Sequence, residues 1–411
     1  MKKSRMRPGF WRTCIFAGTV LLLVGGGVSG ADLVVSPGES IGAKVQNLRP
    51  GDTLLVKKGV YSESITISGL KGTQAAPIVI KGEPGAEINV SGGEDGILIY
   101  GGGGSAWVTI DGLKIMNARR AGVIMSRSQH ITVRNCICLN NRKWGIQTVG
   151  CDYITVENCD LSGSTIQHGV YFSSTDHPVA RNNRIYNNAA CGIHMNGEKK
   201  EGGDGLIMGG IIENNVIYGN GFKNGGSAIN MSAAEKTIVR NNLLYNNGAG
   251  GIVSYAGDIG HAGSSNQIYN NTVYFRPGEG RFGLQLVNGT KDTTVKNNIF
   301  VGGRGPALAV DRDSLDGLRS DYNIYYQHGG KDPIELPRDN RMSLEAWRRA
   351  TSQDVHSLSV DPRFENASSG DFHLKADSRG INGGTAAPVD RDLEGKKRPV
   401  GRAIDIGAYE K

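Results

Sequence analysis

Side chains able to exchange protons are concentrated in one stretch of this sequence. His168 and Tyr171 lie close together, and His194 follows one structural repeat later. Both residue types can accept or donate a proton to a bound ligand when their pKa is suitably placed. The three residues are therefore candidate catalytic groups. The alternative is that both histidines are polar positions hydrogen-bonded to the backbone, and His177, which precedes a proline, is expected to belong to a turn.

A charged, glycine-rich segment, residues 196–204, follows His194 and contains two adjacent lysines. Long loops on a rigid scaffold often carry binding residues. We expect Lys199 to supply a catalytic cation, and Asn196 and Lys200 to contact the substrate. The alternative is a solvated surface loop without a role in binding.

Acidic residues in the same segment are candidate metal ligands. Glu198, Glu201 and Asp204 offer the carboxylate oxygens that Ca²⁺ prefers, although the sequence contains no dedicated calcium-binding loop. We therefore consider Ca²⁺ as a cofactor, with Glu198 and Asp204 as its ligands, and expect no other cofactor.

A sequence repeat must position these residues. The tract Asn-Asn-x-x-Tyr begins at residues 182, 214, 241 and 270, and weaker copies begin at residues 135, 158, 297 and 322. Successive copies are 23–32 residues apart. Short β-branched segments separated by glycine and asparagine at this period predict a coil in which each turn contributes short strands. The leucine pattern of a leucine-rich repeat is absent.

Two columns of apolar residues accompany the repeat and are expected to point into the coil. The first column is Ile110, Val133, Val156, Ala180, Ile212, Val239, Ile268 and Val295. The second column is Val123, Ile146, Val170, Ile193, Ile229, Ile252, Leu284 and Leu308.

The residue after each member of the second column should point outward, because side chains alternate along a strand. These residues are Ile124, Gln147, Tyr171, His194, Asn230, Val253, Gln285 and Ala309. The middle polar members form a strip about 15 Å long at about 4.8 Å per turn. Gln147 and Asn230 are therefore predicted to bind substrate beside Tyr171 and His194.

Residues 1–31 predict a secretory signal peptide. Basic residues precede an apolar run from Ile15 to Val24, and small residues lead to Ala31, which is the order of a cleavable leader. The run is too short for a comfortable membrane span. We expect an exported monomer, secreted or periplasmic, without a membrane span.

The charge gives no reason to expect a nucleic-acid partner. Cleavage of the leader removes five of 46 basic residues, so the formal net charge falls from +7 to about +2 against 39 acidic residues. Aromatic residues are not interleaved with a basic stripe, as nucleic-acid binding would favour.

Both ends of the coil are expected to be covered, because an open strand edge templates aggregation. Apolar residues at helical spacing predict a capping helix over residues 40–48. The repeat is lost after Tyr326, so we assign the β-helix and its N-terminal cap to residues 32–326 and a C-terminal capping region to residues 327–411. Within that region, residues 343–351 predict a short helix capped by Ser343.

Five cysteines remain after cleavage of the leader, and Cys136 and Cys159 occupy the asparagine column one turn apart. We expect buried thiols that replace asparagine or isoleucine in the stack. The pair Cys136 and Cys138 lacks the spacing of a zinc site.

The helix followed by Pro-Gly-Asp-Thr, the segment Gly59-Val60-Tyr61, the asparagine ladder and the closing Asp-Ile-Gly-Ala-Tyr-Glu resemble secreted proteins of the pectin-lyase-like superfamily. The resemblance covers essentially the whole mature chain. It implies an all-β fold, a right-handed parallel β-helix with an N-terminal capping helix and an irregular C-terminal cap. Members include polysaccharide lyases, uronan epimerases, glycoside hydrolases and proteins without demonstrated chemistry, so the fold alone does not select the activity.

The resemblance implies an acidic polysaccharide as the partner and β-elimination as the first hypothesis. A lyase needs a cation or hydrogen-bond donors at the uronate carboxylate, a base at C5 and an acid for the leaving oxygen. Lys199 or Lys200 would provide the cation, His168 or His194 the base, and Tyr171 the acid.

Other activities remain open at this point. The main alternative is a non-catalytic glycan-binding or envelope-associated protein, favoured by aromatic residues such as Trp144 and Tyr171. An epimerase or a hydrolase ranks third. The Asp-Pro-His motif of alginate epimerases is absent, since Asp176-His177-Pro178 has a different order, and the strip has no paired carboxylates for inverting hydrolysis.

Overall fold

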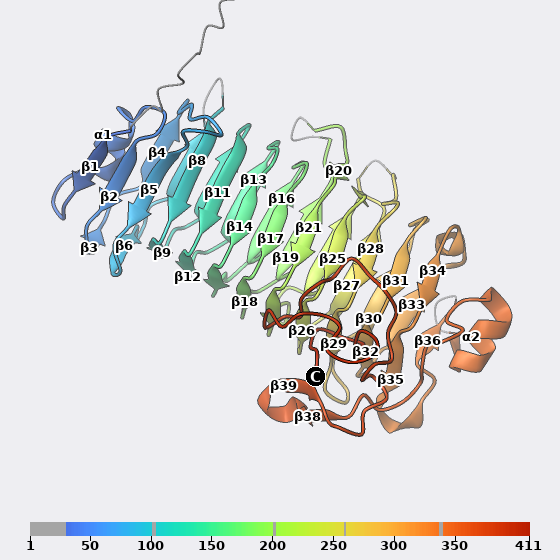
Figure 1. The fold of residues 1–411 in the computed structure, drawn as a ribbon. Helices are drawn as coiled ribbons and strands as arrows, with labels where there is room; N and C mark the ends of the chain where they lie inside the picture. Colours follow the sequence, from blue (N-terminus) through green and yellow to red (C-terminus); the bar gives the residue numbers. More distant parts are fainter. Residues whose placement is uncertain (1–29, 101–103, 200–202, 259, 337–339) are drawn as a thin grey trace, which may run out of the picture.

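The computed structural model describes residues 30–100, 104–199, 203–258, 260–336 and 340–411. The chain winds through three strands per turn, and the equivalent strands of successive turns pair in parallel (Figure 1). This is a right-handed parallel β-helix, so the fold prediction is confirmed. The predicted signal peptide falls almost wholly outside the described residues.

Three long sheets run along the coil and are named A, B and C. Sheet A contains β1 (Asp32–Val35), β2 (Thr53–Val56), β5 (Ile78–Gly82), β8 (Ala106–Asp111), β11 (Gln129–Arg134), β14 (Thr155–Glu157), β17 (Val179–Arg181), β21 (Ile211–Glu213), β25 (Ile238–Arg240), β28 (Gln267–Tyr269), β31 (Thr294–Lys296) and β34 (Arg319–Asp321). Sheet B contains β3 (Gly59–Tyr61), β6 (Ala86–Asn89), β9 (Lys114–Met116), β12 (Ile137–Leu139), β15 (Asp160–Ser162), β18 (Arg184–Tyr186), β22 (Val216–Tyr218), β26 (Leu243–Tyr245), β29 (Thr272–Tyr274), β32 (Ile299–Gly302) and β35 (Ile324–Gln327).

Sheet C carries the candidate site. It contains β4 (Ile65–Ser68), β7 (Asp95–Tyr100), β10 (Ala121–Ser126), β13 (Trp144–Val149), β16 (Val170–Ser173), β19 (Ile193–Asn196), β23 (Ile229–Ser232), β27 (Gly250–Tyr255), β30 (Phe282–Leu286), β33 (Leu308–Val310), β36 (Ile334–Glu335) and β37 (Arg341–Met342), of which the last two pair antiparallel. Two small sheets pair β20 (Ile207–Met208) with β24 (Ala234–Glu235) and β38 (Phe364–Asn366) with β39 (Asp371–Leu374).

The two apolar columns form the core, as the repeat predicts. Every member of both columns is at most 1% exposed. The small residue before the second column is required by close packing, since a Cβ on Gly169 would lie 2.4 Å from Cγ2 of Ile185. The alternation of strand residues therefore places the next position, which holds Tyr171 and His194, on the outer face.

Stacked asparagines fill the corner between sheets A and B. The Nδ2 atom of each one donates to Oδ1 of the next at 2.9–3.0 Å through Asn183, Asn215, Asn242, Asn271, Asn298 and Asn323. The preceding asparagine takes the left-handed turn, as Asn241 does with φ 58°, a conformation that asparagine tolerates better than most residues. A second, shorter ladder of Asn188, Asn220 and Asn247 lies at the next corner.

The cysteines behave as the sequence predicts. Cys136 and Cys159 extend the asparagine column, and all five cysteines among the described residues are buried free thiols.

The N-terminal end of the coil is covered by α1 (Ile41–Val45), which contacts β2 and β4. Ser40 caps this helix by accepting from the backbone N–H of Ala43 at 3.1 Å. The helix ends before the predicted residue 48, but Leu48 is still buried.

The C-terminal end is covered by α2 (Leu344–Thr351), capped by Ser343 as predicted, and by the segment that follows it. Trp347 is fully buried, and the backbone N–H groups of Asn323 and Tyr325 donate to Ser357 and Leu358. Three short 3₁₀ helices, η1 (Arg312–Leu315), η2 (His328–Gly330) and η3 (Ala367–Ser369), complete the described elements.

The last segment of the chain does not lie over the final turn, where the sequence placed its motifs. It runs back along the side of the coil (Figure 1), where Asn297 donates to Thr385 and Asn270 donates to Asp405. Buried Arg398 pairs with Glu410 at 3.0 Å and donates to Asn241. The turn asparagines of several coils thus hold the tail.

Candidate active site on sheet C

The predicted outward strip exists on sheet C. Gln147 pairs in register with Tyr171, Tyr171 with His194, and His194 with Asn230. Tyr171, His194 and Asn230 are half-buried, whereas Gln147 is only 8% exposed and its Oε1 has no hydrogen-bond partner among the described residues. Asn230 accepts from the backbone N–H of Ser227 at 3.3 Å.

His168 and His194 form one hydrogen-bonded chain with Tyr255. The backbone N–H of Cys191 donates to Nδ1 of His168 at 3.1 Å. Nε2 of His168 lies 3.2 Å from Nδ1 of His194, and Nε2 of His194 lies 3.3 Å from the Tyr255 hydroxyl.

The Cys191 amide fixes the direction of this chain. Because Nδ1 of His168 accepts, a neutral His168 carries its proton on Nε2 and donates to His194. His194 then carries its own proton on Nε2 and donates to Tyr255. Burial lowers the pKa of His194 to about 4, and burial together with the charge of His194 lowers the pKa of His168 well below its ordinary value, so both rings are neutral at neutral pH.

Tyr171 is paired with a buried carboxylate. Its hydroxyl donates to Oε1 of Glu198 at 2.7 Å, and Nδ2 of Asn196 donates to both groups. Glu198 is 6% exposed, and Ser174 holds its backbone by donating to the carbonyl at 2.5 Å. Burial, followed by the contacts with Glu198, raises the pKa of Tyr171, so the tyrosine is a neutral phenol whose proton faces a carboxylate.

The remaining residues of the charged segment do not join this cluster in the described structure. Lys199 is exposed, and Asp204 accepts from the backbone N–H of Leu206 at 2.9 Å. The predictions for Lys200 and Glu201 lie outside the described residues. Asn196 is therefore the predicted loop residue that contacts Tyr171.

The contacts of Glu198 favour a role other than calcium binding. Its Oε1 already accepts from Tyr171 and Asn196, and a calcium ion needs several unengaged oxygen atoms. Ca²⁺ binding by Glu198 and Asp204 stays a prediction from the sequence.

A second metal candidate consists of His168, Cys191 and His194, whose ligand atoms lie within 4.8 Å of one another. A metal on Nε2 of His168 would need the lone pair there, but the Cys191 amide forces the proton onto that atom. Burial also raises the pKa of the Cys191 thiol to about 12, which opposes the thiolate form. The cluster therefore suits a hydrogen-bonded chain better than a transition metal.

Two residues of the hydrogen-bonded cluster on sheet C, Tyr255 and Glu198, were not predicted in the positions that they take. Tyr255 lies two positions after the outward residue Val253, at the end of the long strand β27, and this spacing was a usable signal. Glu198 was expected to bind metal, and the sequence gives no sign that the long loop folds it back against Tyr171. Trp144 stacks on Tyr171 with ring centroids 5.9 Å apart.

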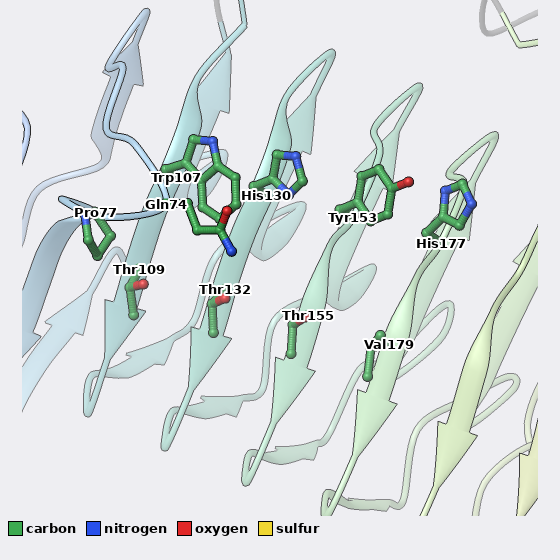
Figure 2. Close-up of a pocket in the computed structure, with 10 residues that line it drawn as sticks. All are labelled: Gln74, Pro77, Trp107, Thr109, His130, Thr132, Tyr153, Thr155, His177 and Val179. Atoms are coloured by element: carbon green, nitrogen blue, oxygen red, sulfur yellow. The ribbon is translucent and has the colours of Figure 1, made fainter. Parts of the chain in front are cut away.

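A different hollow of about 390 Å³ lies on sheet A (Figure 2). The rings of Trp107, His130, Tyr153 and His177 stack along it at 4.0–4.8 Å, beside a row of threonines. Because each ring covers the face of its neighbour, mainly ring edges are left for a ligand. His177 also bonds Asp152 at 2.9 Å, which agrees with its expected role in a turn.

The fold and the polar strip define a parallel β-helix protein with a hydrogen-bonded histidine and tyrosine cluster on one outer sheet. Over residues 84–203 and 202–332, more than half of the chain, the sequence matches the family described as right handed beta helix region. The protein belongs to this family. Among the described residues, no helix is long and apolar enough to cross a membrane.

Individual proteins similar to this chain have diverse descriptions. The uncharacterized protein YwoF of Bacillus subtilis (strain 168) is 29% identical over 173 residues, a match that spans 41% of this chain and only 37% of that protein. The pectate lyase Pel9A structure superposes over 94% of this chain and 98% of its own, with a TM-score of 0.62 and 16% identity. An alginate lyase from Paenibacillus sp. str. FPU-7 superposes over 74% of this chain and 99% of its own, with a TM-score of 0.56 and 18% identity.

Proposed function

We propose that this protein is an exported polysaccharide lyase that cleaves an acidic polysaccharide by β-elimination on sheet C. The observation that carries the proposal is a set of two hydrogen-bonded pairs, each with one half-buried and one buried residue. The half-buried Tyr171 is backed by the buried Glu198, and the half-buried His194 is backed by the buried His168. Each outer group thus has an inner partner that fixes its proton.

The reaction needs three functions. A base removes the proton at C5 of a uronate, the bond from C4 to the glycosidic oxygen breaks as the C4=C5 double bond forms, and the leaving oxygen takes a proton. The intermediate stage places extra negative charge on the substrate carboxylate, so hydrogen-bond donors there lower the barrier.

His194 suits the role of donor to that carboxylate. Its low pKa keeps the ring neutral with the proton on Nε2. Tyr255 accepts this proton in the structure, and the substrate carboxylate replaces Tyr255 as the acceptor when the polymer binds. Neutral imidazoles in buried sites act as electrophiles in this way. His168 is then a positioning residue, which differs from the role of base that the sequence suggested for either histidine.

Tyr171 suits the role of base. It accepts the C5 proton while its phenolic proton passes to Glu198, 2.7 Å away. Tyr255 receives a hydrogen bond from His194. Its own proton passes to the leaving oxygen. After the product leaves, Glu198 releases a proton to solvent and Tyr255 takes one up.

The comparisons support the substrate class through the named activities of the pectate lyase and alginate lyase structures. At 16% and 18% identity these structures support the fold. The proposed reaction rests on the sheet C residues described above. Export is supported by the leader pattern over residues 1–31.

The test is ultraviolet absorbance of the unsaturated uronate during incubation of the mature protein with a panel of uronic-acid polysaccharides, with and without Ca²⁺. A rise on one polymer that disappears in Tyr171→Phe supports the proposal. A flat trace on every polymer, with no shortening of the chains, rejects it. Inversion at C5 without cleavage would instead indicate an epimerase, which shares the first proton transfer.

Glycan binding without turnover is the second candidate. The specific observation in its favour is that His168, His194, Tyr171 and Glu198 are all already hydrogen-bonded to one another or to neighbours. Binding of a polymer that is unchanged after prolonged incubation would support this candidate.

A further inference from the structure

The outward column that holds Tyr171 and His194 continues into a pocket near the C-terminal end of sheet C. Beyond Asn230 the register passes through Val253, Gln285 and Ala309 to Glu335. Gln285, Ala309 and Glu335 line a pocket of about 540 Å³. Three turns separate His194 from Gln285, which corresponds to roughly 14 Å at about 4.8 Å per turn.

Three arginines line this pocket. Arg281 and Arg304 lie just before β30 and β33, on neighbouring turns joined by a hydrogen bond from the N–H of Gly305 to the carbonyl of Gly280 at 3.1 Å. Both arginines are exposed. Arg341 comes from β37, the antiparallel strand that ends the sheet.

The charges of the pocket are only partly compensated. Nε of Arg341 lies 3.3 Å from Oε2 of Glu335, so this pair is already neutralised. Asp311 also lines the pocket, and its Oδ2 is 3.5 Å from the N–H of Asn288. Within the described part of the chain, neither Arg281 nor Arg304 has an acidic side chain in ion-pair contact.

We infer that Arg281 and Arg304 bind the carboxylate of a sugar residue in an acidic polysaccharide whose chain lies along sheet C. Guanidinium groups bind planar carboxylates through paired N–H donors, and two of them on adjacent turns can share one carboxylate or bind two successive ones. Gln285 and Asp311 offer partners for the sugar hydroxyls. The link to catalysis rests on the proposed lyase function, whereas the binding itself does not.

The pocket also gives the site a direction. On the other side of Tyr171 the same column holds Gln147, Ile124 and Leu98, which offer no charge. The acidic sugar units of the polymer are therefore recognised on the C-terminal side of Tyr171, several sugar units from the bond that breaks.

The experiment compares the wild-type chain with Arg281→Ala/Arg304→Ala in binding to a polyuronate, a sulfated glycan and a neutral glycan of similar length. A matched control, Arg349→Ala/Arg402→Ala, removes the same charge from exposed positions elsewhere. Each charge-assisted pair contributes enough that the double variant should bind the polyuronate at least tenfold more weakly. The control and the neutral glycan should show no change.

Three results would overturn the inference: an unchanged affinity for the polyuronate, an equal loss in the control variant, or a loss confined to the sulfated glycan. The same experiment distinguishes failure of the arginine pocket from failure of the lyase proposal. Arginine-dependent binding without turnover would retain the pocket and reject the lyase. Turnover with a raised KM and little change in kcat in the double variant would support both, whereas turnover indifferent to both arginines would retain only the lyase.

Discussion

Nε2 of His168 lies 3.2 Å from Nδ1 of His194, on the neighbouring turn of the coil. The contact has one polarity because the Cys191 N–H occupies the other nitrogen of His168. His194 consequently presents a proton, not a lone pair, towards Tyr255. A single backbone amide thus decides which atoms of the site can donate and which can accept.

The first prediction concerns the base. Glu198→Gln keeps a hydrogen-bonding group beside Tyr171 but cannot take up its proton, so kcat should fall about 10²- to 10⁴-fold. Tyr171→Phe should reduce it at least as much. Circular dichroism and thermal melting should match the wild type. Activity within a few-fold of the wild type in Glu198→Gln would remove the Tyr171–Glu198 pair from the chemistry.

The second prediction separates proton transfer from calcium binding. If Glu198 acts on Tyr171, then Asp204→Asn should retain activity, and chelation with EDTA should not change the rate. The measurement is the rate of each variant at several concentrations of added Ca²⁺. Parallel losses in Glu198→Gln and Asp204→Asn that calcium partly restores would favour the ligand role assigned from the sequence.

The third prediction is a pH dependence of stability. Burial depresses the pKa of both His168 and His194 in the folded protein, so the unfolded chain takes up protons first, near its pKa of about 6.5. Stability is therefore fully present above about pH 6.5 and declines as the pH falls towards about 4. Each histidine contributes a slope of up to about 1.4 kcal/mol per pH unit.

Urea denaturation at pH 7.5, 6.0 and 5.0 measures this slope. His194→Gln should flatten it. An identical slope in wild type and His194→Gln would show that the buried pair is not its origin.

The repeat made the scaffold predictable from the sequence. Stacking in parallel forces equivalent residues of successive turns into register, so a period read from Asn-Asn-x-x-Tyr places Tyr171 beside His194 without knowledge of the loops. The same logic identified Cys136 and Cys159 as members of the asparagine column. It could not place the C-terminal tail, because that segment has no repeat and is held by Arg398 and the turn asparagines.

The chemistry of the site was less predictable for a physical reason. Glu198 follows β19, outside any strand, and its position is held by single contacts such as Ser174 to the Glu198 carbonyl. The tautomer of His194 depends on the direction of the Cys191 N–H, which a sequence pattern does not report. The register thus placed Tyr171 beside His194, but it gave neither Tyr255, nor the contact of Glu198 with Tyr171, nor the positions of the protons.

The fourth prediction tests the inward and outward assignment. Ile193 is fully buried and His194, the next residue, is half-buried on the outer face. Ile193→Asp places a charge in the core and should unfold or aggregate the protein, since an unpaired buried charge costs several kcal/mol. His194→Ala should abolish turnover and leave the far-ultraviolet spectrum unchanged. A soluble, well-folded Ile193→Asp would contradict the observed register.

The fifth prediction extends the asparagine ladder by one residue. Sγ of Cys159 contacts the carbonyls of Glu157 and Val133 at 3.3 and 3.6 Å. In the regular part of the ladder, Nδ2 of Asn242 donates to the two equivalent carbonyls, those of Arg240 and Ile212, at 3.0 and 2.9 Å. Cys159→Asn should therefore place its amide on the same acceptors and also on Oδ1 of Asn183, which already accepts from the Cys159 N–H.

The new amide replaces weak thiol contacts by hydrogen bonds worth about 0.5–1.5 kcal/mol each, so Cys159→Asn should raise the urea midpoint or leave it unchanged. The matched variant Asn242→Cys does the reverse within an intact ladder. It removes the acceptor of the Asn215 backbone N–H and of one Nδ2 hydrogen, while the other Nδ2 hydrogen keeps the Ala180 carbonyl. Two unsatisfied buried N–H groups should cost about 2–4 kcal/mol. Equal destabilisation by both substitutions would show that the corner selects side-chain volume and not the continuity of amide hydrogen bonds.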